Sequence, residues 1–376
     1  MKYISKTIAL FLLGTITIHA EVDFYKKAHM QNRNSETKIE KAYQAVNKIL
    51  NENKKTKTTQ TALIKPTFSK LIPLLHPQIS STIDTSVYAK NIAISKDETI
   101  AYVADTRGGV QIIDTTNATI INTIDTPGSA LDIKISNDEN YLFVADKHKG
   151  LQIIDIQNPK EAFIIGSLET NDDAKSIAVS SNNRYLFLTN ENSGVMIVDI
   201  YNKTKPREIS KIKTKGMAED IALSFDNKYA YIATGAFGLQ IVDIQNINHP
   251  RKVATLTTDD YAQAITISKN ANYAFIADNR SGMQIINIAN VHNPKKVSTF
   301  KTKNQATNIA LSNDQKTAFI ADYEEGMQIV DISNIYQPKL KVSLDTKSYA
   351  EDVQISSTGD KAYIADGWNG LVIMDI

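Results

Sequence analysis

Cysteine is absent from the 376 residues, which excludes disulfide bonds, thiolate metal sites and a cysteine nucleophile. Neither sign of charge is in excess, because 42 lysines and arginines face 41 aspartates and glutamates and leave a net charge of +1. We therefore expect no nucleic-acid partner, since that function requires a basic excess on one face. The motifs of a serine-hydrolase elbow, a phosphate-binding loop and a zinc-protease helix are missing as well.

The N-terminus has the pattern of a secretory signal. Lys2 and Lys6 precede an apolar run from Ile8 to Ile18, and the small residue Ala20 follows. This run is shorter than the roughly 20 residues that span a bilayer, and no later segment qualifies. We predict a signal peptide over residues 1–20 and a mature protein without an integral membrane segment, which is secreted across the inner membrane and is periplasmic, extracellular or at the cell surface. An ordinary N-terminal helix is the alternative.

Residues 21–75 differ in composition from the rest of the chain. Apolar residues recur at helical spacing between Ser35, a candidate N-cap, and Leu50. One amphipathic helix cannot bury its own apolar stripe, so it must dock on something or stay marginal. We predict a helical leader and linker, which is either a spacer or a partner-binding helix.

The rest of the chain repeats one short pattern seven times. A glycine, an alternation of apolar and polar residues and usually an aspartate recur, as in "GLQIVDI" from Gly238 and "GMQIVDI" from Gly326. The spacing is 41 residues once and then 44 five times, from the glycines Gly109, Gly150, Gly194, Gly238, Gly282, Gly326 and Gly370.

Each repeat contains four strand-like runs. In residues 217–260 they are "DIALS", "KYAYIA", "LQIVDI" and "KVATLT", separated by turn signals. Four strands in 40 to 45 residues are typical of a propeller blade. Two columns recur throughout: an aromatic in the second strand, which predicts packing between blades, and an alanine that opens the first strand, which predicts crowding at the axis. They are Tyr102, Phe143, Phe187, Tyr231, Phe275, Phe319 and Tyr363, and Ala89, Ala130, Ala174, Ala218, Ala262, Ala306 and Ala350.

The two ends of the repeat region complement each other. The last repeat stops at Ile376 after its third strand, whereas "HPQISSTIDTS" from His76 resembles a fourth strand with no blade before it. We predict an all-β fold: a seven-bladed β-propeller of four-stranded blades over residues 76–376, in which the N-terminal strand completes the last blade and no sheet edge is left open at the closure.

The repeated unit resembles the LVIVD repeat family of bacterial and archaeal secreted or surface proteins. The resemblance covers residues 76–376, and one departure is Asn287, which replaces the aspartate found in the other repeats. It implies a β-propeller and brings no catalytic residues with it. Because propellers serve as scaffolds, lactonases and quinoproteins, the fold alone does not select a function.

One face of the propeller is predicted to vary between blades. The loop after the second strand and the loop into the next first strand emerge on the same side, and they carry different residues in each repeat. The candidate binding residues on this face are Trp368, Arg107, Arg280, Phe237, Tyr323 and His148. Unconstrained solvent loops would show the same variation. Trp368, the only tryptophan, lies in a polar loop and is the first candidate contact for a partner.

Carboxylates gather near the axis, just after the alanine column. Hard cations such as calcium require six to eight oxygen ligands, so converging carboxylates predict a possible calcium site. The candidate ligands are Asp132, Glu219, Asp220, Glu351 and Asp352. A salt-paired, hydrated funnel with Lys90 and Lys175 is the alternative. The aspartates of the recurring "AD" pair, such as Asp105 and Asp146, are instead expected to accept backbone hydrogen bonds within their own turns.

Two functions follow from these patterns. The first is a non-catalytic binding propeller, secreted or of the cell envelope, which recognises a protein or glycan through the variable face and needs no cofactor. The second is a calcium-dependent hydrolase of lactonase type that uses the acidic mouth of the channel. Of the six histidines, His19 and His29 precede the repeats, and His76, His249 and His292 belong to loops expected on the face opposite the acidic mouth, so only His148 is expected on the variable face. This scarcity favours the binding protein.

Overall fold

The computed structural model describes residues 77–376, so the predicted signal peptide and helical leader lie outside the described residues. Within this range the chain forms 28 strands and one short 3-10 helix, η3 (Pro159–Glu161). No helix of residues 77–376 is long and apolar enough to cross a membrane.

The strands have the following bounds. Those before residue 200 are β1 (Gln78–Ile83), β2 (Asn91–Ile94), β3 (Ile100–Ala104), β4 (Val110–Asp114), β5 (Thr119–Ile124), β6 (Asp132–Ile135), β7 (Tyr141–Ala145), β8 (Leu151–Asp155), β9 (Phe163–Leu168), β10 (Ala174–Val179), β11 (Tyr185–Asn190) and β12 (Gly194–Asp199). Those after it are β13 (Arg207–Ile212), β14 (Asp220–Leu223), β15 (Tyr229–Ala233), β16 (Leu239–Asp243), β17 (Arg251–Leu256), β18 (Ala264–Ile267), β19 (Tyr273–Ala277), β20 (Met283–Asn287), β21 (Lys295–Phe300), β22 (Asn308–Leu311), β23 (Thr317–Ala321), β24 (Met327–Asp331), β25 (Lys339–Leu344), β26 (Asp352–Ile355), β27 (Lys361–Ala365) and β28 (Leu371–Asp375).

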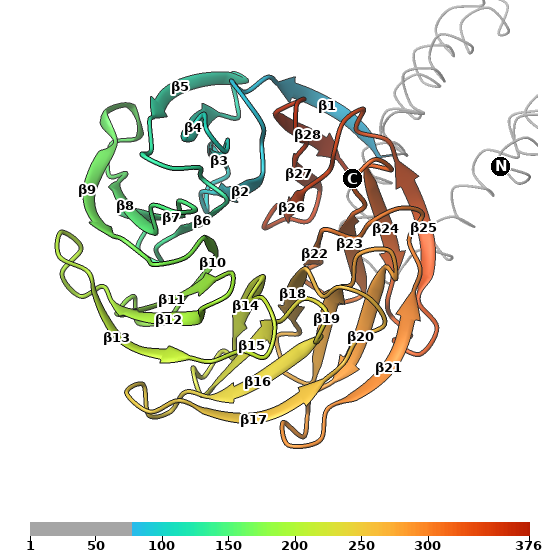
Figure 1. Ribbon diagram of the computed structural model, residues 1–376. Coiled ribbons are helices and arrows are strands. Elements are labelled where there is room, and N and C mark those ends of the chain that lie inside the picture. The colour runs from blue at the N-terminus through green and yellow to red at the C-terminus, as the bar shows by residue number, and fades with distance from the viewer. Residues whose placement is uncertain (1–76) are drawn as a thin grey trace, which may run out of the picture. The chain divides into compact units, whose positions relative to one another are not determined.

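Seven four-stranded antiparallel sheets surround a central axis (Figure 1). Blade 1 is β2–β5, blade 2 is β6–β9, and each later blade takes the next four strands up to blade 6, which is β22–β25. The first strand of each blade lies innermost and the fourth outermost. The predicted seven-bladed propeller is therefore confirmed. In blade 4 the four predicted strands agree with β14 to β17 to within one residue at each end.

Blade 7 draws its strands from both ends of the described range. Its order is β1-β28-β27-β26, so β1 forms the outer strand of a sheet whose other three strands end the chain. The hydroxyl of Ser80 also donates to the carbonyl of Ile373 at 3.1 Å. Because the last three strands gain their fourth from β1, the seven sheets follow one another around the ring without an open gap (Figure 1).

The core lies between neighbouring blades. All seven recurring alanines are fully buried, and the recurring aromatics are at most 5% exposed. Tyr231 of blade 4 packs in one cluster with Ile265 and Ala274 of blade 5, and Tyr363 of blade 7 packs with Ile92 and Ala101 of blade 1. The aromatic column therefore joins adjacent sheets, as its repetition predicted.

The repeated glycine is required by a close approach of two strands. Gly238 has φ +75°, a conformation that residues with a side chain rarely adopt. A Cβ atom there would lie 2.3 Å from the carbonyl oxygen of Leu256 in β17. Only glycine fits, which explains why every repeat has this residue at the entry to its third strand.

The aspartates that follow the second strands bond differently from the expectation. Asp105 accepts hydrogen bonds from Thr85 Oγ1 at 2.8 Å and from the backbone N–H of Val87 at 3.0 Å, and both donors lie in the linker between β1 and β2. Asp146 accepts from Thr126 and Gly128 in the same way. The prediction that these carboxylates serve their own turns was wrong in its partners. The side chains of Asp105 and Asp146 are buried and accept from linker groups 18 to 20 residues earlier, so they fasten blades 1 and 2 to the linkers that enter them.

Candidate binding face

The variable loops lie on one face because of a repeated backbone contact. In the loop after the second strand, the second residue pairs with the recurring alanine before the next inner strand. Examples are Thr106 with Ala130 and Gly235 with Ala262. The N–H of Ala130 donates to the carbonyl of Thr106 at 3.0 Å. The second-to-third-strand loop of one blade is thereby held beside the linker into the next blade.

Four aromatic side chains form a row on this face across blades 6, 7 and 1. Tyr323 stacks on Tyr349 with ring centroids 4.5 Å apart, Tyr349 lies 6.4 Å from Tyr88, and Tyr88 meets Trp368 edge to face at 5.1 Å. Trp368 is still 64% exposed. Such ring pairs contribute about 0.5–1.5 kcal/mol beyond their buried area. The row, defined as Tyr323, Tyr349, Tyr88 and Trp368, is therefore a fixed platform with an accessible end.

The position of Tyr88 depends on its neighbours. Gly367 has φ +53°, and a Cβ atom there would come within 3.1 Å of the Tyr88 ring, so the missing side chain makes room for the tyrosine. The Tyr88 hydroxyl donates to Glu351 Oε1 at 2.6 Å, and the other oxygen of Glu351 pairs with Lys90 Nζ at 2.6 Å. Burial raises the pKa of Tyr88, and the charge of Glu351 raises it further. The phenol therefore stays neutral and acts as a hydrogen-bond donor.

Blades 4 and 5 repeat this arrangement. The Tyr261 ring covers Gly235, and its hydroxyl donates to Glu219 Oε1. Glu219 in turn lies 3.4 Å from Lys175 Nζ. No tryptophan accompanies this second tyrosine, although Met217, whose sulfur lies 3.4 Å from the Tyr261 hydroxyl, is 40% exposed. The aromatic row of blades 6, 7 and 1 is therefore an extension of a motif that the fold uses twice.

The other predicted binding residues lie elsewhere on the ring. Arg107, His148 and Arg280 are exposed at equivalent loop positions of blades 1, 2 and 5. Phe237 is not at the equivalent position: its N–H donates to the carbonyl of Thr234, as that of Ser281 does to Asp278, so it is one residue later in its turn. Ala236 is the true equivalent, and the sequence alignment of this loop was wrong by one residue.

Phe237 nevertheless contributes to the face. Its ring is 39% exposed and lies 4.6 Å from Lys215 Nζ. Two of the predicted residues, Trp368 and Tyr323, are thus linked through the aromatic row, and the other four lie apart from it.

Tyr88 and Tyr349 belong to the row although the sequence patterns did not indicate them. Both immediately precede a recurring alanine, Ala89 or Ala350. This column varies between repeats, so it carries no repeated signal. A comparison of the residues before the alanine would have found the tyrosines.

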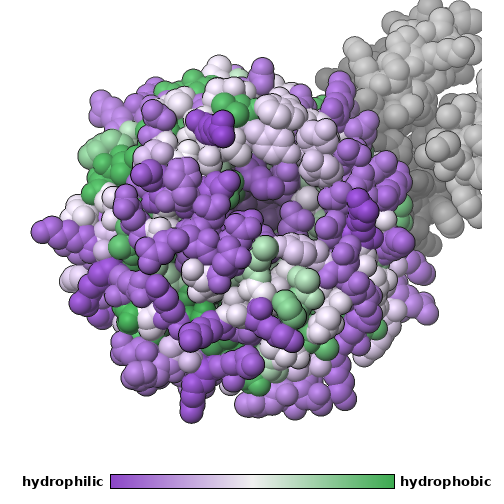
Figure 2. Space-filling model, in the orientation of Figure 1, coloured by the Kyte–Doolittle hydropathy of each residue, from purple (hydrophilic) through white to green (hydrophobic). Residues whose placement is uncertain are grey.

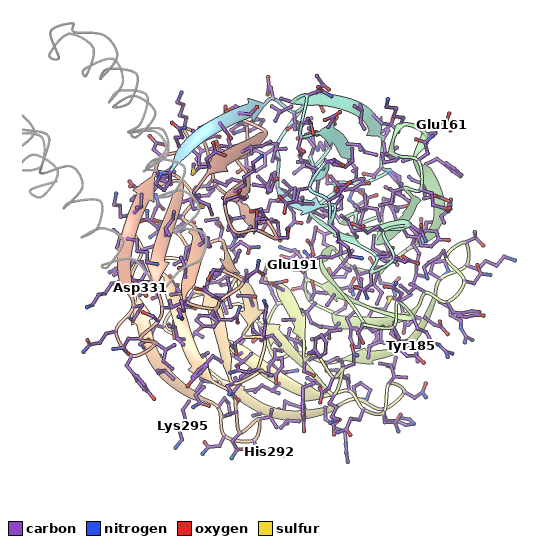
Figure 3. All side chains as sticks on the ribbon, turned by 180° about the vertical axis from the view of Figure 1, so that it is seen from behind. Glu161, Tyr185, Glu191, His292, Lys295 and Asp331 are labelled. Atoms are coloured by element: carbon purple, nitrogen blue, oxygen red, sulfur yellow. The ribbon has the colours of Figure 1, made fainter. Side chains whose placement is uncertain are left out.

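The carboxylates near the axis occupy two successive positions of the inner strands and their entry. Glu219 and Glu351 occupy the first position, directly after the recurring alanine. Each accepts a hydrogen bond from a tyrosine and forms an ion pair with a lysine, as described above. The salt-paired part of the alternative prediction is therefore present. Figure 3 places Glu191, which lies 3.8 Å from Lys175, towards the centre of the ring and His292 at its outer edge.

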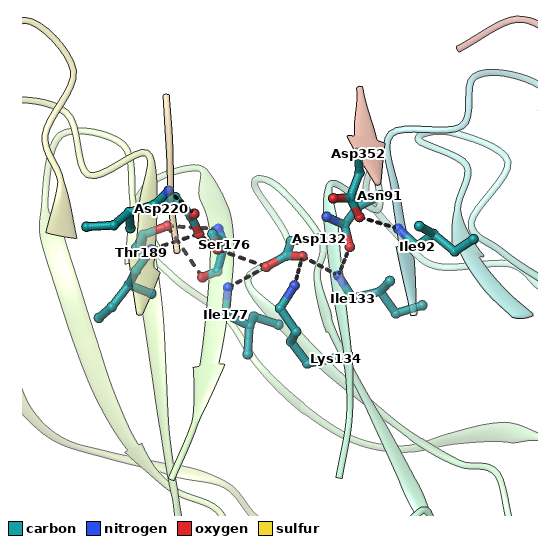
Figure 4. Close-up of polar contacts among 12 residues, drawn as sticks. Asn91, Ile92, Asp132, Ile133, Lys134, Ser176, Ile177, Thr189, Asp220 and Asp352 are labelled. Atoms are coloured by element: carbon teal, nitrogen blue, oxygen red, sulfur yellow. Dashed lines mark hydrogen bonds and ion pairs between the residues drawn. The ribbon is translucent and has the colours of Figure 1, made fainter. Parts of the chain in front are cut away.

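Asp132, Asp220 and Asp352 occupy the second position and join neighbouring blades (Figure 4). Each accepts from a backbone N–H of another blade: Ile177 to Asp132 at 2.7 Å, Ile265 to Asp220 at 2.8 Å, and Ile92 to Asp352 at 3.1 Å. Each also accepts from the residue that follows it. Their lone pairs are therefore largely committed to holding the inner strands together.

Lys134 lies among these three aspartates and was not predicted. Its ammonium donates to Asp132 Oδ1 at 2.8 Å. Burial alone would lower the pKa of Lys134, but the charges of Asp132, Asp352 and Asp220 outweigh it and raise the pKa, so the lysine is charged. Burial raises the pKa of Asp352 to about 6 and raises that of Asp220 as well. The channel thus carries a resident cation.

This arrangement gives little support to the predicted calcium site. Within residues 77–376, no group of three or more histidine, aspartate or glutamate side chains is placed to hold a metal ion. The five candidate carboxylates are divided between two positions, and their oxygens are engaged with backbone, tyrosine and lysine donors. Calcium binding remains a prediction.

Figure 2 shows one face of the propeller as mainly hydrophilic and hollowed at the axis.

Comparison with known proteins agrees with the geometry. A family model for the LVIVD repeat matches seven segments, at residues 87–124, 127–170, 172–214, 215–258, 260–302, 305–346 and 348–376. No curated protein matches the sequence. Among solved structures, the β-propeller domain of Cps50 (Swd1) from Myceliophteria thermophila is similar, with a TM-score of 0.68 and 11% identity over 80% of this chain and 100% of that one. At this identity the likeness shows the fold alone.

Proposed function

The chain belongs to the LVIVD repeat family, and we propose that it is a non-catalytic binding protein of the cell envelope whose variable face captures a partner. The observation that carries the proposal is the aromatic row with Trp368 64% exposed at its end. The signal-peptide pattern of residues 1–20 supports a location in the periplasm or at the cell surface.

Physical chemistry favours this face over the channel as the functional site. Tryptophan and tyrosine are enriched at the energetic centres of interfaces, where truncation typically costs about 2 kcal/mol or more. The row already holds Tyr88 and Tyr349 in place through stacking and through Glu351, so little side-chain entropy remains to be lost on binding. A protein partner fits this surface best, and a glycan is the other outcome that the experiment distinguishes.

Trp368→Ala tests the proposal. We expect capture of the partner from an envelope extract to weaken about 30-fold, which corresponds to roughly 2 kcal/mol. The lost edge-to-face contact with Tyr88 is worth about 1 kcal/mol, so the melting temperature should fall by no more than a few degrees. Tyr336→Ala is the matched control, because Tyr336 is a 69% exposed aromatic in a loop of the opposite face.

Equal capture by the two variants would contradict the proposed site. Protease treatment of the extract should abolish capture if the partner is a protein, whereas periodate treatment should abolish it if the partner is a glycan. Turnover of lactones or esters that requires calcium and is lost in Asp220→Asn would instead support the hydrolase and overturn the non-catalytic function.

A further inference from the structure

A second feature lies on the face opposite the variable loops, between blades 3 and 4. The strand ends of blade 3 and the loop before β17 of blade 4 border an open pocket of about 360 Å³. Its wall includes Arg184, Tyr185, Asp199, Arg207 and Ile247. Figure 3 labels Tyr185 and so marks the position of the pocket. The volume is at the small end of the range for ligand sites, enough for one sugar-sized group.

Two guanidinium groups converge in this pocket on one carboxylate. Arg207 Nη2 donates to Asp199 Oδ2 at 3.1 Å, and Arg184 Nη2 lies 3.8 Å from the same oxygen. The Asp199 side chain is only 6% exposed, whereas those of Arg184 and Arg207 are 51% and 75% exposed. A guanidinium has five N–H donors, so the buried carboxylate orients both groups and leaves most of their donors free to face a ligand.

The local charge favours an anion. Two arginines face one buried aspartate, and Glu208, the other acidic residue of the wall, is paired with Lys211 at 3.4 Å. Burial alone would raise the pKa of Asp199, but hydrogen bonds from the Tyr201 N–H and Arg207 lower it, so Asp199 is charged at neutral pH. An excess of one positive charge remains at the pocket.

Two tyrosines hold Arg184 in place. Its guanidinium carbon lies 5.3 Å from the centroid of the Tyr185 ring and 5.9 Å from that of Tyr201, within the range of cation–π attraction. Tyr201 is 80% exposed, so one side of its ring remains available. The arginine fork is preorganised beside an open aromatic surface, and this combination suits an oxyanion attached to a small polar body.

Blade 4 shows which residues of the pocket are shared with a neighbouring blade and which are specific to blade 3. Arg251 lies 3.3 Å from Asp243 in blade 4, which reproduces the pair of Arg207 and Asp199. At the position of Arg184, however, blade 4 has Lys228, which pairs with Asp226 at 3.0 Å, and at the position of Tyr201 it has Gln245. No other blade has an arginine or an aromatic at these two positions. Arg184 and Tyr201 therefore distinguish blade 3 from blade 4, which has the same arginine–aspartate pair.

We propose that this site binds an acidic sugar unit, with its carboxylate or sulfate held in the pocket by Arg184 and Arg207 and its ring extending beyond the pocket wall to Tyr201, which lies against Arg184. The site is independent of the variable face and would give the propeller a second binding surface. Guanidinium groups match carboxylate and tetrahedral oxyanions through paired N–H donors, so the acidic group anchors the ligand and the contact of the sugar ring with Tyr201 adds affinity that a free anion lacks. A neutral sugar of the same size lacks that group.

Titration calorimetry of the full chain at low ionic strength tests the site, with glucuronic acid, glucose and inorganic sulfate as probes. We expect saturable binding of glucuronic acid, at least tenfold weaker binding of sulfate and none of glucose. Arg184→Gln should weaken glucuronic acid binding at least tenfold, and Arg184→Lys, which keeps the charge but loses the fork, should be intermediate. Arg251→Gln, the equivalent arginine of blade 4, should change the affinity less than twofold.

Thermal melting of each variant shows that the loss is one of binding, since Arg184 lies at the surface and its replacement should leave the fold intact. If a uronic acid oligomer binds although the monomer does not, the natural ligand is part of a polysaccharide and the site is still supported. Binding of sulfate as tight as that of glucuronic acid would overturn the sugar assignment. Absence of saturable binding by monomer and oligomer alike, or an equal loss in Arg184→Gln and Arg251→Gln, would overturn the site.

Discussion

Replacement of Asp132 by alanine should destabilise the propeller through the junction of its inner strands. The carboxylate accepts four hydrogen bonds, from Ser176 Oγ at 2.9 Å, Ile177 N at 2.7 Å, Ile133 N at 2.8 Å and Lys134 Nζ at 2.8 Å. The first two donors belong to blade 3, so the substitution removes two hydrogen bonds that tie blade 2 to blade 3 near the axis.

The magnitude follows from what the alanine would leave behind. Removal of one member of a buried ion pair typically costs about 3–5 kcal/mol, because the other charge remains uncompensated. The side chain of Lys134 is 38% exposed and still faces Asp220 and Asp352, so the penalty should lie at the low end of this range. We expect the free energy of unfolding of Asp132→Ala to fall by about 3 kcal/mol.

Urea unfolding at pH 7 measures this effect directly. Lys134→Met removes the orphaned charge, so the double variant Asp132→Ala/Lys134→Met should be more stable than the sum of the two single effects implies. A loss below about 1 kcal/mol for Asp132→Ala, or simple additivity in the double variant, would refute this account of the channel.

Four further outcomes are expected. A chain without residues up to Asp84 should melt far lower because β28 loses its outer partner, whereas deletion of only 21–70 should change the melting temperature little; equal effects would contradict closure by β1. Gly238→Ala should cost about 2 kcal/mol or more, because its Cβ would collide with the β17 carbonyl, and chemical denaturation checks this. Burial raises the pKa of Asp146 and Asp366 to about 6, so each carboxyl binds a proton more readily in the folded than in the unfolded protein. Their contribution to stability should therefore rise as the pH falls from 7 towards 4. Asp366→Asn should flatten the dependence of the melting temperature on pH in that window. Calcium at 100 times its dissociation constant would add about 2.7 kcal/mol if the predicted site exists, and an unchanged melting curve is the result that the occupied carboxylates favour.

The local sequence was sufficient to determine the architecture. Alternating apolar residues, turn signals and a glycine every 41 to 44 residues indicate four strands per unit, and the unmatched strand beside Pro77 indicates how the last blade is filled. These features were predictable because a repeat multiplies each weak signal by seven. Gly238 illustrates the reason: its backbone approaches the neighbouring strand too closely for any side chain, so the same residue must recur in every blade.

Only the tertiary structure decided which side chains meet. Tyr88 and Trp368 are 280 positions apart in the sequence, yet they touch because the ring brings blade 1 beside blade 7. Asp132 resembled a calcium ligand by residue type, but its lone pairs are taken by Ile177 of the next blade and by Lys134, contacts that composition and spacing cannot reveal. Repetition fixes the contacts that every blade shares, whereas the contacts of residues that depart from the repeat depend on the closed ring.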